Sequence, residues 1–190
     1  MTAILRPALV TFLGLTALTG VAYPLAVTGA ARLLFPAQAA GSLVHRDGVL
    51  VGSALLGQDT SDPRYFWGRL SATPEHPANA ASSGASNLSA SNPDLRKGAE
   101  ARIQALRAAD PGNGAAVPAD LVTASASGLD PHISPQAARY QTARVARLRG
   151  LPEARVAALV SRGTEGRQWG LFGEPRVNVL KLNLALDALR

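Results

Sequence analysis

Residue types that commonly do chemistry are present in this chain, but not in the arrangements that catalysis or metal binding needs. Serine is abundant, yet the sequence contains no Gly-x-Ser-x-Gly turn and no Ser-x-x-Lys pair, two local signatures of serine nucleophiles. The histidines are His45, His76 and His132, and none has a second metal-type ligand at helical spacing. No glycine loop for phosphate occurs, and the absence of cysteine removes thiolate nucleophiles and thiolate metal sites. We therefore expect no catalytic residue, no metal site and no chemistry by this chain alone.

One aromatic run and two polar runs stand out instead. Tyr65-Phe66-Trp67-Gly68-Arg69 places three aromatic side chains beside a guanidinium. That composition suits an interface anchor, and equally a small core clamped by Arg69. The two polar runs, residues 83–87 and 122–130, are rich in small residues that permit close backbone approach. For any single residue of these runs, a tight turn held by a side-chain hydrogen bond is the simpler interpretation. A membrane-tethered hydrolase that uses a serine of the second polar run is the alternative.

The elements that must position these runs begin with an apolar N-terminal segment. From Pro7 to Ala31 there is no Asp, Glu, Lys, Arg or His. A helix of that length rises about 37 Å, enough to cross a hydrocarbon layer of about 30 Å. We predict one transmembrane helix over residues 7–34, after a short tail of residues 1–6. A cleavable signal peptide and a buried core helix are the two alternatives. Ala37-Gln38-Ala39 resembles a cleavage site, but the apolar segment is longer than either alternative would have.

The predicted anchor also has features that favour contact with other helices. Gly14 and Gly20 are small residues that would let a neighbouring helix approach closely. Pro24 leaves a carbonyl one turn earlier without its partner, so we expect a kink at Tyr23-Pro24. The flanking charges do not set the orientation, because Arg6 and the amino terminus balance the basic residues that follow the helix.

The chain carries a formal net charge of +6. Its basic residues are spread over several predicted helices and form no block of like charge. We interpret this surplus as a solvated surface and expect no nucleic-acid partner. A polyanion-binding protein is the weaker alternative, and a steep dependence of binding on salt would mark it.

Residues 42–190 are predicted to form one α+β domain after a linker of residues 35–41. Its first element is a hairpin over residues 43–57 with Asp47-Gly48 as its turn. The next stretch, residues 58–92, is long for an ordinary loop and is either functional or packed against a partner. The other expected elements are helices that start at Asn92-Pro93, near Pro118, at Ser134-Pro135 and at Pro152, a strand over Arg176–Leu180 and a last helix over Asn183–Leu189.

At its polar and aromatic runs the chain resembles a known family, the C subunits of the potassium-transporting Kdp ATPase (the KdpC family). The resemblance covers nearly the whole chain and is most specific in the second polar run. The matching segments are Leu5-Arg6-Pro7-Ala8, Thr19-Gly20, Tyr23-Pro24, residues 52–58, Tyr65-Phe66, Gly68-Arg69, residues 71–73, 86–88 and 91–93, Val117-Pro118, residues 121–130, 133–138, 177–179 and 182–187.

The resemblance implies a non-catalytic accessory subunit of an ATP-driven potassium importer in the bacterial cytoplasmic membrane. The implied partners, besides the lipid bilayer, are a channel-like potassium-binding subunit, a P-type ATP-hydrolysing subunit and a small single-helix subunit. The family is described as a catalytic chaperone that raises the ATP affinity of the hydrolysing subunit. Gln136 matches the position proposed to contact ATP in a transient complex.

The resemblance also orients the chain, with the amino terminus in the cytoplasm and the domain outside. A domain outside cannot touch cytoplasmic ATP. The alternative function is therefore that it stabilises the channel-like subunit, or shapes the path by which potassium enters, without nucleotide contact. The candidate partner-interface residues are Tyr23, Pro24, Tyr65, Phe66, Arg69, Ser86, Asn87, Ser125, Ser127 and Asp130.

Overall fold

The computed structural model describes residues 2–189, and the chain divides into two compact units between Ser53 and Ala54. Helices and strands are both present, as the sequence predicts for a mixed fold. The predicted domain was expected to start at residue 42. The division lies later because the hairpin that follows the N-terminal helix belongs to the first unit.

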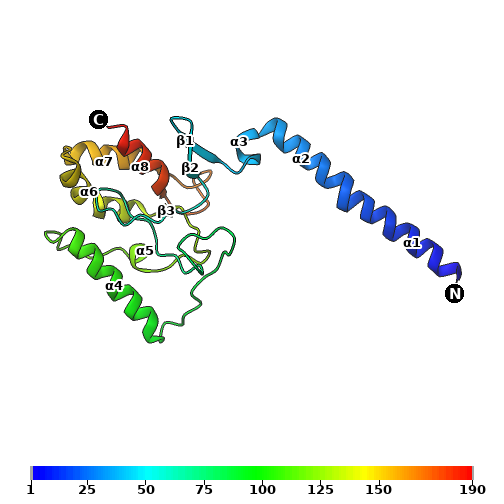
Figure 1. The fold of residues 1–190 in the computed structure, drawn as a ribbon, viewed down its shortest axis with the longest axis horizontal. Coiled ribbons are helices and arrows are strands. Elements are labelled where there is room, and N and C mark those ends of the chain that lie inside the picture. Colours follow the sequence, from blue (N-terminus) through cyan, green and yellow to red (C-terminus); the bar gives the residue numbers. More distant parts are fainter. Residues whose placement is uncertain (1, 190) are drawn as a thin grey trace. The chain divides into compact units, whose positions relative to one another are not determined.

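A long helix opens the first unit (Figure 1). It consists of α1 (Thr2–Ala17), a five-residue π-helical turn η1 (Leu18–Ala22) and α2 (Tyr23–Leu34). Ala3–Leu34 is long and apolar enough to cross a membrane. The helix starts at Thr2 and so includes residues that were predicted to form a short tail. Ile4 and Leu5 in this part are apolar and exposed, like the residues that follow them in the helix.

Pro24, the second of two prolines in the long helix, lies two residues after the π-helical turn. Pro24 has no N–H to donate to the carbonyl one turn earlier, which is the reason a kink was expected. The helix runs on through this position, and Tyr23 donates its backbone N–H to the Leu18 carbonyl, five residues back. A wider π turn is a known way to fit such a local irregularity into a helix.

A short hairpin closes the first unit. After the single helical turn α3 (Pro36–Ala39), strands β1 (Leu43–Arg46) and β2 (Val49–Ser53) pair antiparallel. Asp47 and Gly48 have φ values of 51° and 79°, as a two-residue type I′ turn requires. The turn prediction is confirmed, although the strand ends at Ser53 and not at residue 57.

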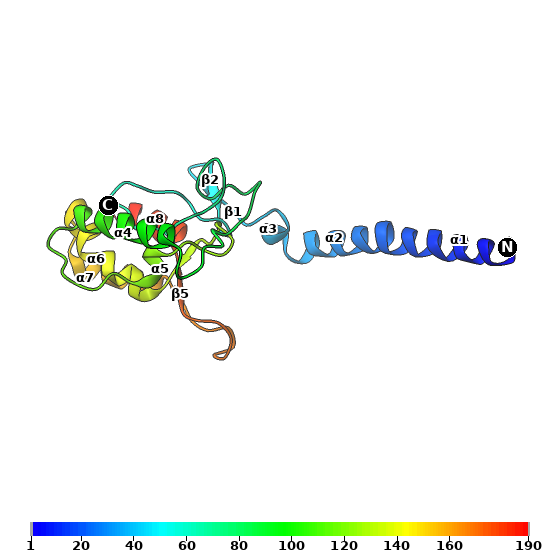
Figure 2. The same cartoon turned by 90° about the horizontal axis from the view of Figure 1, so that it is seen from below.

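Helices make up most of the regular structure of the second unit, and long loops connect them (Figures 1 and 2). Its caps follow the predicted signals: the Asn92 side chain accepts a hydrogen bond from Asp94 N, and Ser134 Oγ accepts one from Ala137 N. Gly150 ends one helix with a φ of 63°. The helices are α4 (Pro93–Ala109), α5 (Ala119–Val122), α6 (Pro135–Arg149), α7 (Glu153–Arg162) and α8 (Val179–Asp187).

A small antiparallel sheet joins these helices, in the order β3 (His132–Ile133), β5 (Arg176–Asn178), β4 (Thr164–Glu165). The C-terminal prediction was wrong in its boundaries, because the strand was expected to reach Leu180. Asn178 ends it by accepting a hydrogen bond from Lys181 N on its side chain, so that α8 starts at Val179.

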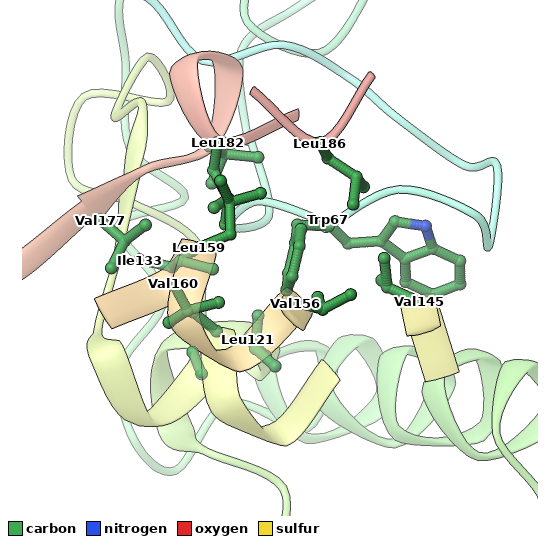
Figure 3. Close-up of a cluster of buried hydrophobic side chains, with 14 of the residues drawn as sticks. Trp67, Leu121, Ile133, Val145, Val156, Leu159, Val160, Val177, Leu182 and Leu186 are labelled. Atoms are coloured by element: carbon green, nitrogen blue, oxygen red, sulfur yellow. The ribbon is translucent and has the colours of Figure 1, made fainter. Parts of the chain in front are cut away.

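The core lies between α6, α7, α8 and the sheet (Figure 3). α6 packs against α7, and α7 against α8. Phe66 and Trp67 from the loop region enter the same core. The remaining buried apolar side chains are Leu106, Leu121, Ile133, Ala137, Ala138, Val145, Ala146, Val156, Leu159, Val160, Val177, Val179, Leu182 and Leu186.

Candidate functional site

The aromatic run is held in the core by two amide side chains. Asn183 of α8 accepts from Phe66 N at 2.9 Å and donates to Phe66 O at 3.0 Å. Gln141 of α6 does the same for Trp67, at 2.8 Å and 3.1 Å. These four bonds satisfy backbone groups that a neighbouring strand would otherwise have to satisfy. Phe66 is fully buried, so its side chain faces the core and not a partner.

Two guanidiniums lie over the indole of Trp67. The Cζ atoms of Arg102 and Arg144 are each 4.8 Å from the ring centroid, a distance that favours cation–π attraction. Arg144 is almost fully buried, donates to Pro63 O and Gln141 Oε1, and has its pKa lowered by burial to about 10. Arg102 donates to Leu121 O and Gly68 O, and burial lowers its pKa as well.

Arg69 joins the aromatic run to the second polar run. Its Nη1 lies 3.1 Å from Asp130 Oδ2, and its Nη2 donates to Ala124 O at 3.3 Å. The other carboxylate oxygen of Asp130 accepts from His132 N at 3.0 Å. Of the two interpretations that the sequence leaves open for this run, the geometry favours a structural clamp.

The two polar runs lie against each other. Gly84 N and Ser83 Oγ both donate to Ser127 O at 2.9 Å. Ser71 Oγ donates to Gly128 O at 2.8 Å and accepts from Ala78 N at 2.9 Å. The long loop of residues 58–92 is therefore fixed by another loop of the same domain.

Glycine is required at the centre of this contact. Gly128 has a φ of 69°, and a Cβ built there would lie 2.5 Å from Thr73 Cγ2 and 2.8 Å from Gly84 O. A Cβ at Gly57 would lie 2.9 Å from Asp130 O. The small residues seen in the sequence thus do permit close backbone approach, and the approach is between loops of this domain.

A polar cavity of about 100 Å³ lies among these loops. Among residues 2–189, Arg69 Nε and Ser125 Oγ are buried here without a hydrogen-bond partner, and no three His, Asp or Glu side chains converge as metal ligands. The lining side chains include Gln58, Arg69, Ser71, Arg102, Ser125 and Asp130.

The serines of the second polar run are poorly placed for nucleophilic catalysis. A serine nucleophile needs an accessible hydroxyl that is paired with a base. Ser125 Oγ is buried, and Ser127 Oγ accepts a hydrogen bond from Leu129 N at 3.1 Å. The geometry thus favours turns over a hydrolase site.

Gln136 is exposed in the first turn of α6. The helix start beside it is already occupied by side chains of the domain. Ser134 Oγ caps Ala137 N at 3.0 Å, and Asp120 Oδ2 accepts from Ser134 N at 2.7 Å. The Asp120 carboxylate supplies the negative charge that a helix N-terminus favours. A phosphate brought to this position would be repelled by the Asp120 carboxylate.

The other candidate interface residues are spread over both units. Tyr23 is exposed on the long helix, next to Pro24. Ser86 and Asn87 are exposed in the loop, and Asn87 has a φ of 51°. Tyr65 is partly buried and donates to Asp187 Oδ2 at 3.2 Å. Contact of these residues with a partner stays a prediction.

Sequence reasoning missed one exposed apolar feature, the loop that joins β4 and β5. Trp169, Leu171 and Phe172 at its tip are all strongly exposed. A signal was available, since Gly166-Arg-Gln-Trp-Gly-Leu-Phe-Gly173 alternates glycines with large apolar residues in the manner of a tight turn.

Comparison with known proteins identifies the family. The model of the family described as "KdpC: K+-transporting ATPase, c chain" matches residues 5–188. Relatives described as potassium-transporting ATPase KdpC subunits come from Polaromonas naphthalenivorans (69% identity, 100% of this chain and 97% of the relative), Variovorax paradoxus (66%, 99% and 97%) and Methylibium petroleiphilum (63%, 100% of both). A match over nearly the whole chain at such identity shows membership, and the chain belongs to the KdpC family, the c chains of K+-transporting ATPases.

Proposed function

We propose that this chain is a non-catalytic accessory subunit of an ATP-driven potassium-import complex. Its partners in this proposal are a channel-like potassium-binding subunit, a P-type ATP-hydrolysing subunit and a small single-helix subunit. Family membership supports the accessory role. The N-terminal helix, long and apolar enough to span a bilayer, would attach the chain to the cytoplasmic membrane, with the amino terminus inside and the domain outside.

The observation that carries the proposal is that the polar groups around the second polar run are hydrogen-bonded to other loops of the same domain. Arg69, Ser71 and Asp130 each make hydrogen bonds to loops of their own domain. Such a network gives a rigid body of fixed shape, which suits a docking subunit. A site for chemistry would instead present these groups to a substrate.

The accessory role can take two forms, which differ in whether ATP affinity changes. In the first, docking of this subunit stabilises the hydrolysing subunit in a form with higher ATP affinity, which is the chaperone role. In the second, the domain stabilises the channel-like subunit or shapes the potassium path, and ATP affinity does not change. Direct contact between Gln136 and ATP is the least favoured variant, because the Asp120 carboxylate lies at the start of α6.

The test is an ATPase titration of the partner subunits with and without the full chain. The chaperone role predicts a clear rise in the apparent KM for ATP when the chain is left out. An unchanged KM, with the chain demonstrably bound, rejects that role and leaves the second route. Gln136→Ala separates direct contact from docking: docking predicts a wild-type KM in the assembled complex.

The side of the membrane can be tested by cysteine labelling, because the chain has no cysteine of its own. Lys97 is exposed on α4, so Lys97→Cys provides a single reactive thiol. An impermeant maleimide should label it in intact spheroplasts. Labelling only after lysis would place the domain in the cytoplasm and contradict the proposed orientation.

A further inference from the structure

The loop between β4 and β5 presents an unusual concentration of exposed apolar surface. Trp169, Leu171 and Phe172 have 81%, 74% and 61% of their surface exposed. Figure 2 shows the hairpin as a long projection away from the helices of its unit. Large apolar side chains grouped on one protrusion are typical of an interaction site.

The tip has a fixed conformation before any partner arrives. Gln168 and Phe172 exchange two backbone hydrogen bonds of 2.9 Å and 3.0 Å, and Arg167 Nη2 lies 2.7 Å and 2.8 Å from the two carboxylate oxygens of Glu174. The rings of Trp169 and Phe172 meet edge to face, with centroids 6.0 Å apart. A preformed tip loses little conformational entropy when it binds.

Charge decides between a lipid surface and a protein as occupant. The hairpin carries two acidic and two basic residues, and these pair as Arg167–Glu174 and Arg176–Glu165. An anionic membrane surface attracts segments with a surplus of Lys and Arg, which this hairpin lacks. A protein pocket that is apolar inside and polar at its rim matches both the apolar tip and the neutral stem.

We propose that the tip formed by Trp169, Leu171 and Phe172 inserts into an apolar pocket on another subunit of the pump. The proposal rests on the accessory role proposed above and names the surface through which this domain binds. Trp169 and Phe172 are the anchors, because large aromatic side chains contribute most of the affinity at protein interfaces. The two ion pairs of the stem position them.

The first test is co-purification of the full chain with tagged partner subunits in detergent. The triple variant Trp169→Ser, Leu171→Ser, Phe172→Ser should be retained about tenfold less than wild type. The matched control is Val49→Ser with Leu50→Ser, which removes exposed apolar side chains from the other hairpin. It should be retained like wild type.

The outcomes separate the two proposals. Wild-type retention of the triple variant overturns the tip proposal and leaves the accessory role intact. Equal loss in both variants also overturns it, because the effect would then belong to apolar surface in general. A wild-type chain that fails to co-purify contradicts the accessory role itself.

Tryptophan fluorescence provides the second test and distinguishes lipid from protein. The two tryptophans differ, since Trp67 is buried and Trp169 is exposed, so a change in emission reports on Trp169. The full chain in vesicles of neutral or anionic lipid should show no quenching of Trp169 by brominated acyl chains. Its emission should shift to the blue only when the partner subunits are present. Quenching in vesicles without partners would identify lipid as the occupant and overturn the proposal.

Discussion

Two segments of the domain have nearly the same composition and opposite surroundings. Residues 65–69 and residues 167–172 each combine a Trp-Gly pair with an arginine and a phenylalanine. In the first, Phe66 and Trp67 are buried in the core; in the second, Trp169 and Phe172 project into solvent. Composition alone therefore does not determine whether an aromatic run becomes core or contact surface.

The difference comes from where the partner groups lie in the sequence. The backbone of Phe66 is bonded to a side chain 117 residues away, and that of Trp67 to one 74 residues away. The ion pair and turn bonds of the second segment join residues no more than seven apart. A buried aromatic run thus depends on long-range contacts, whereas an exposed one needs only a locally stable turn.

The largest difference is expected from removing the phenyl ring in each segment. Phe66→Ala should lower the free energy of unfolding by about 3–5 kcal/mol, because it leaves a cavity in the core. Phe172→Ala should change it by less than about 0.5 kcal/mol, as surface substitutions do. Urea unfolding of the full chain in detergent, followed by circular dichroism, measures both. Similar losses in the two variants would break the comparison.

A smaller difference is expected between Gly128, in the polar run to which Arg69 is bonded, and Gly170 of the exposed segment. Gly128 and Gly170 both have positive φ, so alanine costs each about 1–2 kcal/mol in backbone strain. At Gly128 the new Cβ would also collide with Thr73 and Gly84, which adds about 1–3 kcal/mol, whereas at Gly170 there is nothing within 4 Å. The same unfolding measurement applies. Equal losses of stability in the two variants would mean that the loops around Gly128 can move apart at little cost, and that the two polar runs are not tightly packed.

The smallest difference is expected from the two arginines. Arg69→Met removes bonds to Asp130 and to Ala124 O in a half-buried site, and should cost about 1.5 kcal/mol. Arg167→Met breaks an exposed ion pair with Glu174 and should cost less than about 0.5 kcal/mol. Added salt should leave the first effect largely intact. If Arg69→Met costs no more than Arg167→Met, Arg69 is no clamp.

Local signals predicted much of the secondary structure correctly. The caps at Asn92 and Ser134, the turn at Asp47-Gly48 and the helix end at Gly150 depend on neighbours within a few residues, and all four are present. These features are readable because their hydrogen bonds are made inside the segment itself. The N-terminal helix is readable for the same reason, since its apolar length needs no partner to be recognised.

The errors concern features that depend on distant residues. Strands β3 and β4 have two residues each and exist only because β5 lies between them. The strand expected through Leu180 stops early because Asn178 caps α8. Gln141 and Asn183 read as ordinary polar positions on helices, and only the folded structure shows that they bind the aromatic run. The apolar tip was overlooked because no periodic pattern surrounds it.

The pairing of Phe66 with Asn183 has a consequence for the order in which the domain forms. During synthesis the aromatic run leaves the ribosome more than a hundred residues before its partner on α8 does. Until then the backbone groups of Phe66 lack the Asn183 side chain that binds them in the folded domain. Non-local contacts of this kind form slowly. The nascent domain is thus most exposed to aggregation and proteolysis while its last helix is still being made.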